Sequence, residues 1–261
     1  MKKGFRMDME LKDKTALLTG ASSGIGKAAA QAFYRQGARV ILVGRQRARL
    51  QEAAEGMEPE RFRLEVADIT DAARTQALLD RAAAEWGGID ILVNAAGIIG
   101  FGSIETESLA QWHDMMNINL HAPYMLLRQA LPQLIPRRGA VVNVSSVTGL
   151  RAFPNVLSYC VSKAALDQLT RCTALELAPK GVRVNAVNPG VVLSGLHRSA
   201  GMDEEAYGNF LERSRSTHPL GRVGQVSEVA DLILFLASPR SGWITGLTCS
   251  IDGGRHLTCL R

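Results

Sequence analysis

Tyr159 and Lys163 lie four residues apart in the sequence YCVSK, within a stretch whose pattern predicts a helix. In a helix, this spacing places both side chains on one face. A free tyrosine has a pKa of about 10, too high for proton transfer at neutral pH. A lysine ammonium ~4 Å away contributes about 4 kcal/mol at an effective dielectric constant of ~20, or roughly three pKa units. The pair predicts a tyrosine that acts as a general acid or base; the alternative is an ordinary surface pair.

Two serines and an asparagine are further candidates for the same site. Ser145 and Ser146 follow the apolar run VVNV, and parallel sheets bind ligands at the carboxyl ends of their strands. Either hydroxyl can hold a substrate carbonyl; the alternative for both is a helix cap or a turn. Asn119 lies inside an otherwise apolar helical pattern, where asparagine is a poor helix former. It is either an interior hydrogen-bonding residue or the holder of a water beside Lys163.

Short apolar runs alternate with helical patterns over most of the 261 residues. The pattern predicts strands at 15–19, 40–43, 61–66, 89–93, 140–144, 182–186 and 248–251. Helices are predicted at 24–36, 47–57, 71–86, 108–134, 155–178 and 227–236, with a shorter one at 203–213. This alternation predicts a single-domain α/β fold: a Rossmann-type, doubly wound sheet of about seven parallel strands with helices on both faces.

The chain divides into a tail and one domain. Residues 1–10 are polar and charged and are expected to be a flexible tail. Residues 11–261 form the Rossmann domain, with a substrate lid around 191–221 that interrupts the strand–helix rhythm. The lid and the stretch 98–107 are expected to shape a partly apolar pocket. The apolar lid residues are Leu193, Leu196, Met202, Tyr207 and Phe210.

The sequence TGASSGIG places three glycines between the first strand and the first helix. At such a turn, backbone N–H groups at a helix N-terminus favour a pyrophosphate. Gly20 permits the tight turn, and Gly24 and Gly26 leave room for close backbone approach and helix–strand packing. Ser22 and Ser23 are candidate phosphate or ribose donors. We interpret the motif as a dinucleotide site; the alternative is a flexible glycine-rich turn.

The second strand ends at Gly44 and is followed by Arg45. An NAD site has a carboxylate here for the ribose 2′-hydroxyl, whereas an arginine can pair with a 2′-phosphate. The sequence therefore favours NADP(H) over NAD(H), unless Arg45 belongs only to a basic surface helix. Asp68, after the third strand, either meets the adenine amino group or caps a turn beside Thr70. The run NAAG, Asn94 to Gly97, either passes close to the cofactor or forms a tight turn.

Composition excludes several other classes of protein. The net charge is +5, from 30 Lys and Arg against 25 Asp and Glu, without the dense basic runs typical of nucleic-acid binding. Four cysteines lack C-x-x-C spacing and a histidine cluster, so we expect no metal site and reduced thiols in a cytoplasmic protein. Apolar runs are too short for a membrane span.

In this order the motifs resemble the short-chain dehydrogenase/reductase family over nearly all of residues 11–254. The motif residues are Thr19 to Gly26, Asn94 to Gly97, Asn119, Ser146, Tyr159, Lys163 and Asn188-Pro-Gly190. The resemblance implies a carbonyl–alcohol oxidoreductase with Asn119, Ser146, Tyr159 and Lys163 as catalytic residues. It selects Ser146, thirteen residues before the tyrosine, over Ser145. It also implies that Lys163 holds the nicotinamide ribose and that Asn119 positions a water.

The expected cofactor-binding residues come from each of these motifs. They are Gly20, Ser22, Ser23, Gly24, Ile25, Gly26, Arg45, Asp68, Ile69, Asn94, Ala95, Gly97, Tyr159, Lys163, Pro189, Gly190, Val192 and Ser194. Two of these positions depart from the family pattern. Ala95 stands where asparagine is commoner, and Ser194 stands where threonine is usual. Both changes are expected to be tolerated.

The carboxyl-terminal sequence GWITGLTCSIDGG resembles the 3-oxoacyl-(acyl-carrier-protein) reductase branch. That resemblance implies a 3-oxoacyl thioester substrate and docking of an acyl carrier protein at Arg137 and Lys180, whose alternative is ordinary loop charge. The other functional hypotheses are a hydroxysteroid or polyol dehydrogenase using NAD(H), and a non-catalytic NADP(H) sensor. Relatives imply a homotetramer or dimer joined through the helices that carry Asn119 and Tyr159 and through the last strand. The tail after Gly254 either is unassigned or reaches a neighbouring subunit.

Overall fold

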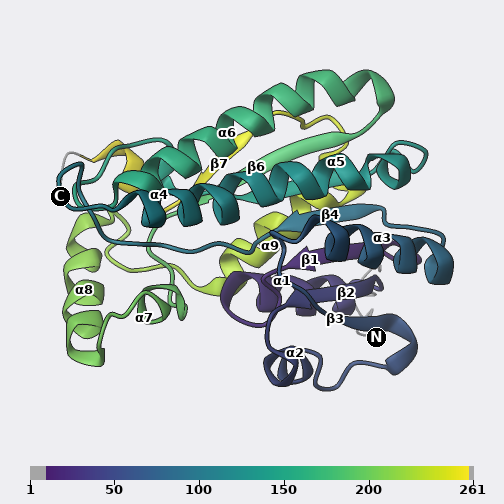
Figure 1. The fold of residues 1–261 in the computed structure, drawn as a ribbon, viewed down its shortest axis with the longest axis horizontal. Coiled ribbons are helices and arrows are strands. Elements are labelled where there is room, and N and C mark those ends of the chain that lie inside the picture. Colours follow the sequence, from purple (N-terminus) through teal and green to yellow (C-terminus); the bar gives the residue numbers. More distant parts are fainter. Residues whose placement is uncertain (1–9, 259–261) are drawn as a thin grey trace, which may run out of the picture.

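The fold is described from a computed structural model, which covers residues 10–258 without the side chains of residues 197 and 199. Seven parallel strands form one sheet in the order β3-β2-β1-β4-β5-β6-β7, which confirms the predicted doubly wound α/β fold (Figure 1). The strands are β1 (Thr15–Thr19), β2 (Arg39–Gly44), β3 (Phe62–Val66), β4 (Ile91–Asn94), β5 (Ala140–Val144), β6 (Arg183–Pro189) and β7 (Thr248–Ile251).

The helices are close to their predicted positions. They are α1 (Gly24–Arg35), α2 (Arg47–Ala53), α3 (Ala72–Trp86), α4 (Leu109–Met116), α5 (Ala122–Leu134), α6 (Leu157–Leu177), α7 (Leu196–Ser199), α8 (Glu204–Thr217) and α9 (Val226–Ala237). The predicted single helix at 108–134 is wrong in one respect, because a π-helical segment, Asn117–His121, separates α4 from α5. A wider π turn changes which side chains face inward, and such segments are frequent at functional sites.

Strand residues alternate between two hydrophobic cores, one on each face of the sheet. Leu18 and Leu42 pack with α1, α2 and α9, whereas Leu17 and Ile41 pack with α3, α5 and α6. Strands β3 and β7 are the two edge strands, and the residues of β3 are partly buried except Val66, which is exposed. Strands β2 and β3 are added on one side of β1, and strands β4 to β7 are added on its other side, so the strand order reverses between β1 and β4. Sheets of this kind bind their ligands at that point, beyond the carboxyl ends of the strands.

The predicted lid at 191–221 forms a separate segment that contains α7 and α8 (Figure 1). Its base is closed by backbone hydrogen bonds on both sides of Val192: the Leu193 amide donates to Gly224 and the Gly224 amide donates to Val191. This bridge lies one residue after the predicted start of the segment and three residues after its predicted end, and the role of the segment as a substrate lid stays a prediction. Of the predicted flexible tail, residues 1–9 lie outside the described residues, and Glu10 pairs with Arg240 at 3.3 Å.

Candidate active site

A cleft of about 900 Å³ lies along the carboxyl edge of the sheet. Segments that follow β1, β2, β3, β4, β5 and β6 all contribute to its walls. Every residue expected to bind the cofactor lines this cleft except Asn94. Ser146 also lines it, whereas Asn119 is fully buried behind the wall. The structure thus brings together motifs that are more than 100 residues apart in the sequence.

The glycine turn is shaped by close backbone contacts. Gly20 has φ +66°, and a Cβ there would lie 2.8 Å from the backbone of Ala96. A Cβ on Gly26 would lie 2.7 Å from the carbonyl carbon of Gly20. Thr19 fixes the facing loop, because its hydroxyl oxygen accepts hydrogen bonds from the Ala95 and Ala96 amides at 3.1 Å. The two loops are thereby held together where a cofactor backbone can pass.

Helix α1 offers its first amides to the cleft. Its N-cap, Ser23, makes no side-chain capping hydrogen bond within the described part of the chain. The first N–H groups of a helix have no partner inside the helix, and they favour a phosphate bound at that terminus. Gly24, at φ +52°, faces Ser194, so the loop after β6 approaches this turn. These features fit a dinucleotide pyrophosphate.

The side chain of Asn94 is engaged inside the protein rather than in the cleft. It is buried, and its Nδ2 donates to Asn143 Oδ1 at 2.9 Å. Asn143 in turn donates to the Thr170 hydroxyl at 2.9 Å. The side chain therefore links β4 to β5 and α6, and the small residues Ala95 to Gly97 line the cleft in its place. Asn94 thus lies outside the described lining of the cleft, and its expected part in cofactor binding stays a prediction.

Two arginines and Asp68 line the end of the cleft beyond β2 and β3, where the adenosine of a dinucleotide is expected. Arg45 follows β2, and Arg49 lies one turn into α2 on the same side. Asp68 Oδ1 accepts hydrogen bonds from the Thr70 amide at 2.9 Å and hydroxyl at 2.7 Å. These bonds, with the charge of Arg45, lower the pKa of Asp68. Asp68 therefore both caps its own turn and faces the cleft.

Ser146 and Tyr159 meet at the centre of the cleft. The Ser146 hydroxyl lies next to the Tyr159 phenol, where it favours the ionised form of the tyrosine, and both residues are 7% exposed. Ser146 also caps a 3-10 turn, since its Oγ accepts from the Thr148 amide at 3.1 Å. Ser145 instead donates to the Lys163 carbonyl at 3.2 Å. The geometry agrees with Ser146, rather than Ser145, as the serine next to the tyrosine.

Lys163 lies one helical turn after Tyr159, with its Nζ 5.7 Å from the centre of the tyrosine ring. The ammonium donates to the Val144 carbonyl at 2.8 Å. Burial raises the pKa of Tyr159 to about 12 and lowers the pKa of Lys163 to about 8. The pKa of Tyr159 is therefore shifted opposite to the expected direction, because desolvation of the phenolate outweighs the lowering effect of the nearby Ser146 hydroxyl. At neutral pH the tyrosine is a phenol, and thus a proton donor.

Asn119 is a fully buried hydrogen-bonding residue. Its Oδ1 accepts from the Ile98 amide and its Nδ2 donates to the Ile98 carbonyl, both at 2.9 Å. A Cβ on Gly97 would lie 3.2 Å from Asn119 Oδ1 and 3.5 Å from Lys163 Nζ. The π turn thus places Asn119 against the loop that faces Lys163. Its expected role in holding a water stays a prediction.

Asp167 and Asn188 form a buried polar pair, and the sequence motifs did not predict this contact. Asn188 Nδ2 donates to Asp167 Oδ2 at 2.8 Å and to the Ser146 carbonyl at 2.9 Å. Burial raises the pKa of Asp167. Because this pair holds the backbone of the serine, it positions Ser146 without lining the reaction centre. The available signal was the spacing of Asp167, one helical turn after Lys163 on α6.

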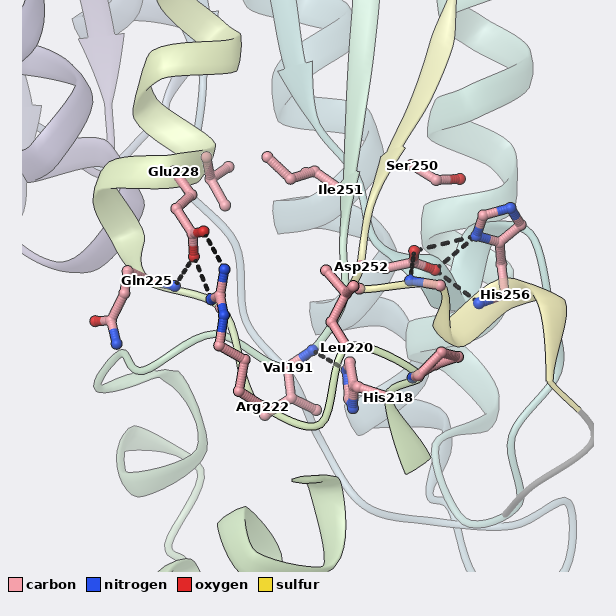
Figure 2. Close-up of a pocket in the computed structure, with 15 residues that line it drawn as sticks. Val191, His218, Leu220, Arg222, Gln225, Glu228, Ser250, Ile251, Asp252 and His256 are labelled. Atoms are coloured by element: carbon pink, nitrogen blue, oxygen red, sulfur yellow. Dashed lines mark hydrogen bonds and ion pairs between the residues drawn. The ribbon is translucent and has the colours of Figure 1, made fainter. Parts of the chain in front are cut away.

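His218 links the lid to the loop after β6, at a second hollow shown in Figure 2. The Val191 amide donates to His218 Nε2 at 3.1 Å. Nδ1 therefore carries the hydrogen and donates to the Ser214 carbonyl of α8 at 2.6 Å. Burial lowers the pKa of His218, which favours this neutral form. No motif in the sequence pointed to this residue.

The outer end of the cleft is built by the lid and the carboxyl-terminal segment. Leu196, Met202 and Phe210 line it as expected, together with Arg213 and Arg255. Tyr207 is buried with its hydroxyl donating to the Ser194 carbonyl at 3.1 Å, and Leu193 faces away. Tyr207 and Leu193 were expected to line the pocket, but both are outside its described lining, and Tyr207 instead holds the lid to the loop after β6.

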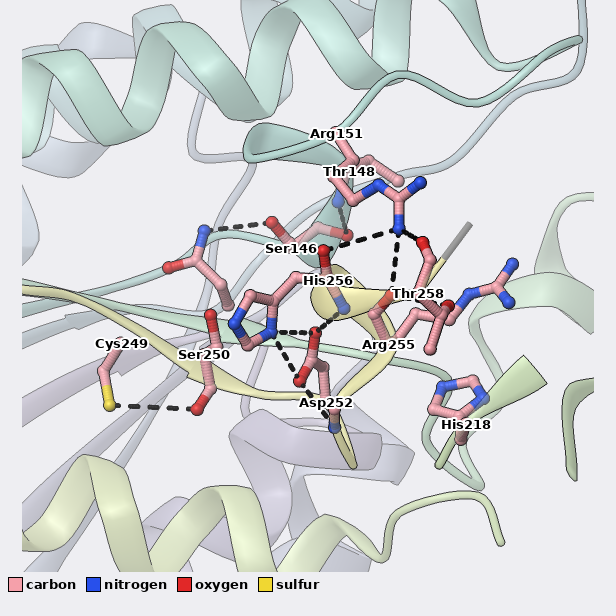
Figure 3. A network of polar contacts seen from close by, with 12 residues as sticks. Ser146, Thr148, Arg151, His218, Cys249, Ser250, Asp252, Arg255, His256 and Thr258 are labelled. Carbon is pink, nitrogen blue, oxygen red and sulfur yellow. Dashed lines mark hydrogen bonds and ion pairs between the residues drawn. The ribbon is translucent and has the colours of Figure 1, made fainter. Parts of the chain in front are cut away.

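The segment after Gly254 folds onto its own subunit. Arg151 Nη1 donates to the carbonyls of Arg255 at 3.2 Å and His256 at 3.4 Å, and to that of Thr258 (Figure 3). A contact of residues 255–258 with a neighbouring subunit stays a prediction, and residues 259–261 lie outside the described residues.

The two expected carrier-docking residues are at the other edge of the sheet. Arg137 precedes β5 and Lys180 precedes β6, at the amino ends of these strands. Arg137 donates to the Gly87 carbonyl at 2.6 Å and pairs with Asp90 at 3.5 Å. This arrangement agrees with the alternative of ordinary loop charge within one subunit.

Residues 10–258 contain neither a candidate metal-binding cluster nor a candidate membrane-spanning helix. Clusters of three or more His, Cys, Asp or Glu side chains suited to a metal ion were not found there. Helices long and apolar enough to cross a membrane were likewise not found in this part of the chain.

Comparisons with known proteins agree with this geometry. A family model described as enoyl-(acyl carrier protein) reductase matches residues 20–256. The 3-oxoacyl-(acyl-carrier-protein) reductase FabG of Thermotoga maritima is 37% identical, over 94% of this chain and 99% of that protein. 2-(S)-hydroxypropyl-CoM dehydrogenase 3 of Xanthobacter autotrophicus is 34% identical, over 95% and 98%. A short-chain dehydrogenase/reductase of unknown function from Caenorhabditis elegans, solved with cofactor, has a TM-score of 0.89 at 34% identity, over 95% and 97%.

Fold, cleft and catalytic geometry together define an oxidoreductase of the nicotinamide-dependent α/β class. The chain belongs to the short-chain dehydrogenase/reductase family, whose members interconvert carbonyl and alcohol groups.

Proposed function

We propose that this protein is an NADP(H)-dependent oxidoreductase that interconverts a ketone and a secondary alcohol, with 3-oxoacyl thioesters as candidate substrates. The observation that carries the proposal is the placement of Ser146 next to Tyr159, with Lys163 one turn further, in a cleft that begins at the glycine turn. The relative named a 3-oxoacyl-(acyl-carrier-protein) reductase supports the thioester.

The proposed mechanism assigns one task to each residue. When bound, the nicotinamide ring supplies the hydride for reduction or accepts it in oxidation. Ser146 Oγ donates a hydrogen bond to the substrate oxygen and holds it beside the Tyr159 phenol. Tyr159 delivers a proton to that oxygen as negative charge develops on it. Lys163 stabilises the resulting phenolate, and its buried position makes its charge effective. Alcohol oxidation runs in reverse.

The rate of reduction should depend on the charge of Lys163. Because the pKa of Lys163 is about 8, the ammonium is present at neutral pH and is lost above that value. With the pKa of Tyr159 at about 12, the phenol stays protonated over this range. We therefore expect kcat/KM for ketone reduction to be level between about pH 6 and about pH 7 and to fall above about pH 8. A profile at saturating NADPH that stays level to about pH 10 would contradict this assignment.

Cofactor preference should rest on Arg45 and Arg49. Both side chains line the cleft beside Ser22, where β2 ends without a carboxylate. Guanidinium groups pair well with a 2′-phosphate, and each charge-assisted hydrogen bond contributes ~1.5–3 kcal/mol. The double variant R45A/R49A should raise the KM for NADPH at least ~10-fold and leave the KM for NADH nearly unchanged.

Arg47 provides the matched control, because it lies on α2 between them but outside the described lining of the cleft. Arg47→Ala should change neither KM. Equal loss of NADPH and NADH binding in R45A/R49A would contradict a role in 2′-phosphate recognition.

A substrate panel tests the proposed function directly. Steady-state rates with NADPH and NADH are measured on short 3-oxoacyl thioesters, steroid ketones and ketoses. Turnover of thioesters with NADPH is the expected result. Turnover only of steroids or sugars with NADH would favour a hydroxysteroid or polyol dehydrogenase. Cofactor binding without turnover of any ketone would favour a sensor, which the placement of Ser146 next to Tyr159 argues against.

We also propose a homotetramer, or a dimer, joined through α5, α6 and β7. Large apolar side chains are exposed on these elements or next to them: Tyr124 on α5 at 49%, Leu175 on α6 at 79% and Trp243 before β7 at 100%. Exposed apolar surface of this kind marks interfaces. A monomer by light scattering at micromolar concentration would exclude both assemblies.

The described cysteines support a reducing compartment such as the cytoplasm. Cys160, Cys172 and Cys249 are free thiols.

A further inference from the structure

His218 is buried between the lid and the loop that follows β6 (Figure 2). It comes directly after α8 and is only 2% exposed. The Val191 amide donates to its Nε2 at 3.1 Å, and its Nδ1 donates to the Ser214 carbonyl at 2.6 Å. A Cβ built on Gly190 would lie 2.8 Å from Nε2, so the backbone of the loop passes directly against the ring. The histidine therefore joins the last turn of α8 to this loop.

The loop joined to His218 forms part of the main cleft. Its residues in the lining of that cleft are Pro189, Gly190, Val191, Val192 and Ser194. Val191 also lines the second hollow, which contains His218, so it separates the two cavities. The lid holds the loop at a second place, because the Tyr207 hydroxyl donates to the Ser194 carbonyl at 3.1 Å. A change at either contact therefore reaches residues that are expected to bind the cofactor.

Protonation of His218 would break one of its two hydrogen bonds. A neutral imidazole has one donor and one acceptor nitrogen, whereas an imidazolium has two donors. Nε2 would then present a hydrogen to the Val191 amide, which would lose its acceptor, while the bond from Nδ1 to Ser214 would remain. A buried amide without a partner is costly. The loop would therefore have to move away from the ring.

Charged groups from two neighbouring segments act on His218. Arg255 donates to the Thr217 carbonyl at 3.1 Å, next to the histidine, and Asp252 follows β7. Burial has the largest effect and lowers the pKa of His218, the charge of Arg255 lowers it further, and the Ser214 carbonyl and Asp252 raise it. A free histidine has a pKa of about 6.5. The hydrogen bond from Val191 is therefore present at neutral pH and is lost as the pH falls through the lowered value.

The other titratable side chains that line this hollow are engaged with one another. His256 Nδ1 lies 2.9 Å from Asp252 Oδ2, and Arg222 Nη2 lies 2.6 Å from Glu228 Oε1 (Figure 2). His218 differs from these residues because its acceptor nitrogen is bonded to the backbone of the loop. A change in its charge therefore acts directly on the loop.

We infer that neutral His218 positions the loop after β6 for the nicotinamide cofactor, so that protonation of this one side chain releases the loop and weakens cofactor binding in acid. The inference rests on the proposed function, because it assigns a proton-dependent positioning residue to the same cofactor site. His218 is outside the described lining of the main cleft and acts through Val191. It is thus a positioning residue and not a catalytic one.

The test measures binding of the oxidised cofactors NADP and NAD, which are stable in acid, to the full-length protein by calorimetry. The dissociation constant of the wild type is expected to rise about 10-fold between about pH 7.5 and about pH 4.5, as the hydrogen bond from Val191 is lost. The 2′-phosphate of NADP also titrates, near pH ~6. Each variant is therefore compared with the wild type at the same pH, which cancels the titration of the cofactor.

Two substitutions of similar polarity separate the contact with Val191 from the contact with Ser214. His218→Gln places an amide oxygen near the position of Nε2, where it accepts from Val191 at every pH. His218→Asn is shorter and reaches only the Ser214 side. In both variants the Ser214 carbonyl keeps a donor, because the Thr217 hydroxyl donates to it at 3.0 Å.

The two variants should differ in their cofactor affinity. His218→Gln should bind like the wild type at about pH 7.5 and should lack the additional loss in acid. His218→Asn should bind about 10-fold more weakly than the wild type already at about pH 7.5. Thermal unfolding of both variants shows over which pH range they are folded, so a loss of affinity in His218→Asn is not mistaken for unfolding.

His256 provides the matched control. It is a second histidine in the same hollow, and its Nδ1 is bonded to Asp252. His256→Gln should keep the pH dependence of the wild type. If His256→Gln removed the loss in acid and His218→Gln did not, the titrating group would be His256, and the inference would be wrong.

Hydrogen exchange at Val191 gives a readout that needs no cofactor. Exchange is followed by mass spectrometry on peptides that contain this residue, in the wild type and in His218→Gln at the same pH. The wild type should exchange faster than the variant at about pH 4.5 and at the same rate at about pH 7.5, because only the wild type loses its acceptor in acid.

The outcomes separate this inference from the proposed function. Equal cofactor affinity of the wild type, His218→Gln and His218→Asn at every pH would overturn the inference and leave the proposed function intact. If neither NADP nor NAD binds the wild type, the proposed function fails, and the exchange experiment decides the inference alone. Equal exchange at Val191 in the wild type and in His218→Gln throughout the pH range would then overturn it.

Discussion

Tyr159→Phe is expected to lower kcat for ketone reduction by ~10²–10⁴-fold, the range that a positioned general acid contributes. The phenol lies next to Ser146, and burial raises its pKa to about 12, so the wild-type side chain holds its proton at neutral pH. Phenylalanine keeps the ring and removes only the hydroxyl. Stopped-flow or steady-state rates of NADPH oxidation measure the loss.

Binding of NADPH should survive this substitution, because the glycine turn, Arg45 and the loop after β6 are untouched. The dissociation constant by fluorescence titration is expected to stay within about threefold of the wild type, less than ~1 kcal/mol. Tyr124 supplies the matched control, since it is an exposed tyrosine on α5. Tyr124→Phe should leave rate and binding unchanged. Wild-type turnover by Tyr159→Phe would remove the tyrosine from the mechanism.

The succession of strands and helices was predictable because it depends on local patterns. Apolar runs such as ALL in β1 and VV in β5 have few other ways to be buried, and both strands have their predicted bounds. Strand β6 was predicted to end at residue 186, but it continues to Pro189. Its two asparagines are fully buried: Nδ2 of Asn185 donates to the Ile244 carbonyl, and Nδ2 of Asn188 donates to Asp167 and to the Ser146 carbonyl.

Properties that depend on three-dimensional surroundings were not predictable. Spacing places Lys163 beside Tyr159, but it does not reveal that both are buried or that the ammonium is bonded to Val144. The pKa of the tyrosine therefore moved opposite to the expected direction. His218 and Arg255 acquire their partners from segments that are distant or irregular, and no periodic pattern marks such contacts.

Gly26→Ala is expected to damage both the cofactor site and the fold. A Cβ at this position would lie 2.7 Å from the Gly20 carbonyl carbon and 3.1 Å from the Thr19 oxygen. Backbone cannot rotate away as a flexible side chain can, so α1 must shift from the turn that it packs against. Overpacking of this kind costs ~1–3 kcal/mol. We expect a lower melting temperature and at least ~10-fold weaker NADPH binding, because displaced amides bind phosphate poorly.

Gly208→Ala is the matched control, since the same change is made inside another helix. Gly208 lies in α8, is exposed and has no atom within 4 Å of a built Cβ among the described residues. Alanine favours a helix interior over glycine by ~0.8–1.0 kcal/mol, so this variant should be as stable as the wild type or more so. Thermal unfolding and NADPH titration on both variants separate the effect of the contact from that of the residue type. If Gly26→Ala matched Gly208→Ala in both measurements, α1 would have room to move, and the close approach of α1 to Gly20 would not be what shapes the cofactor site.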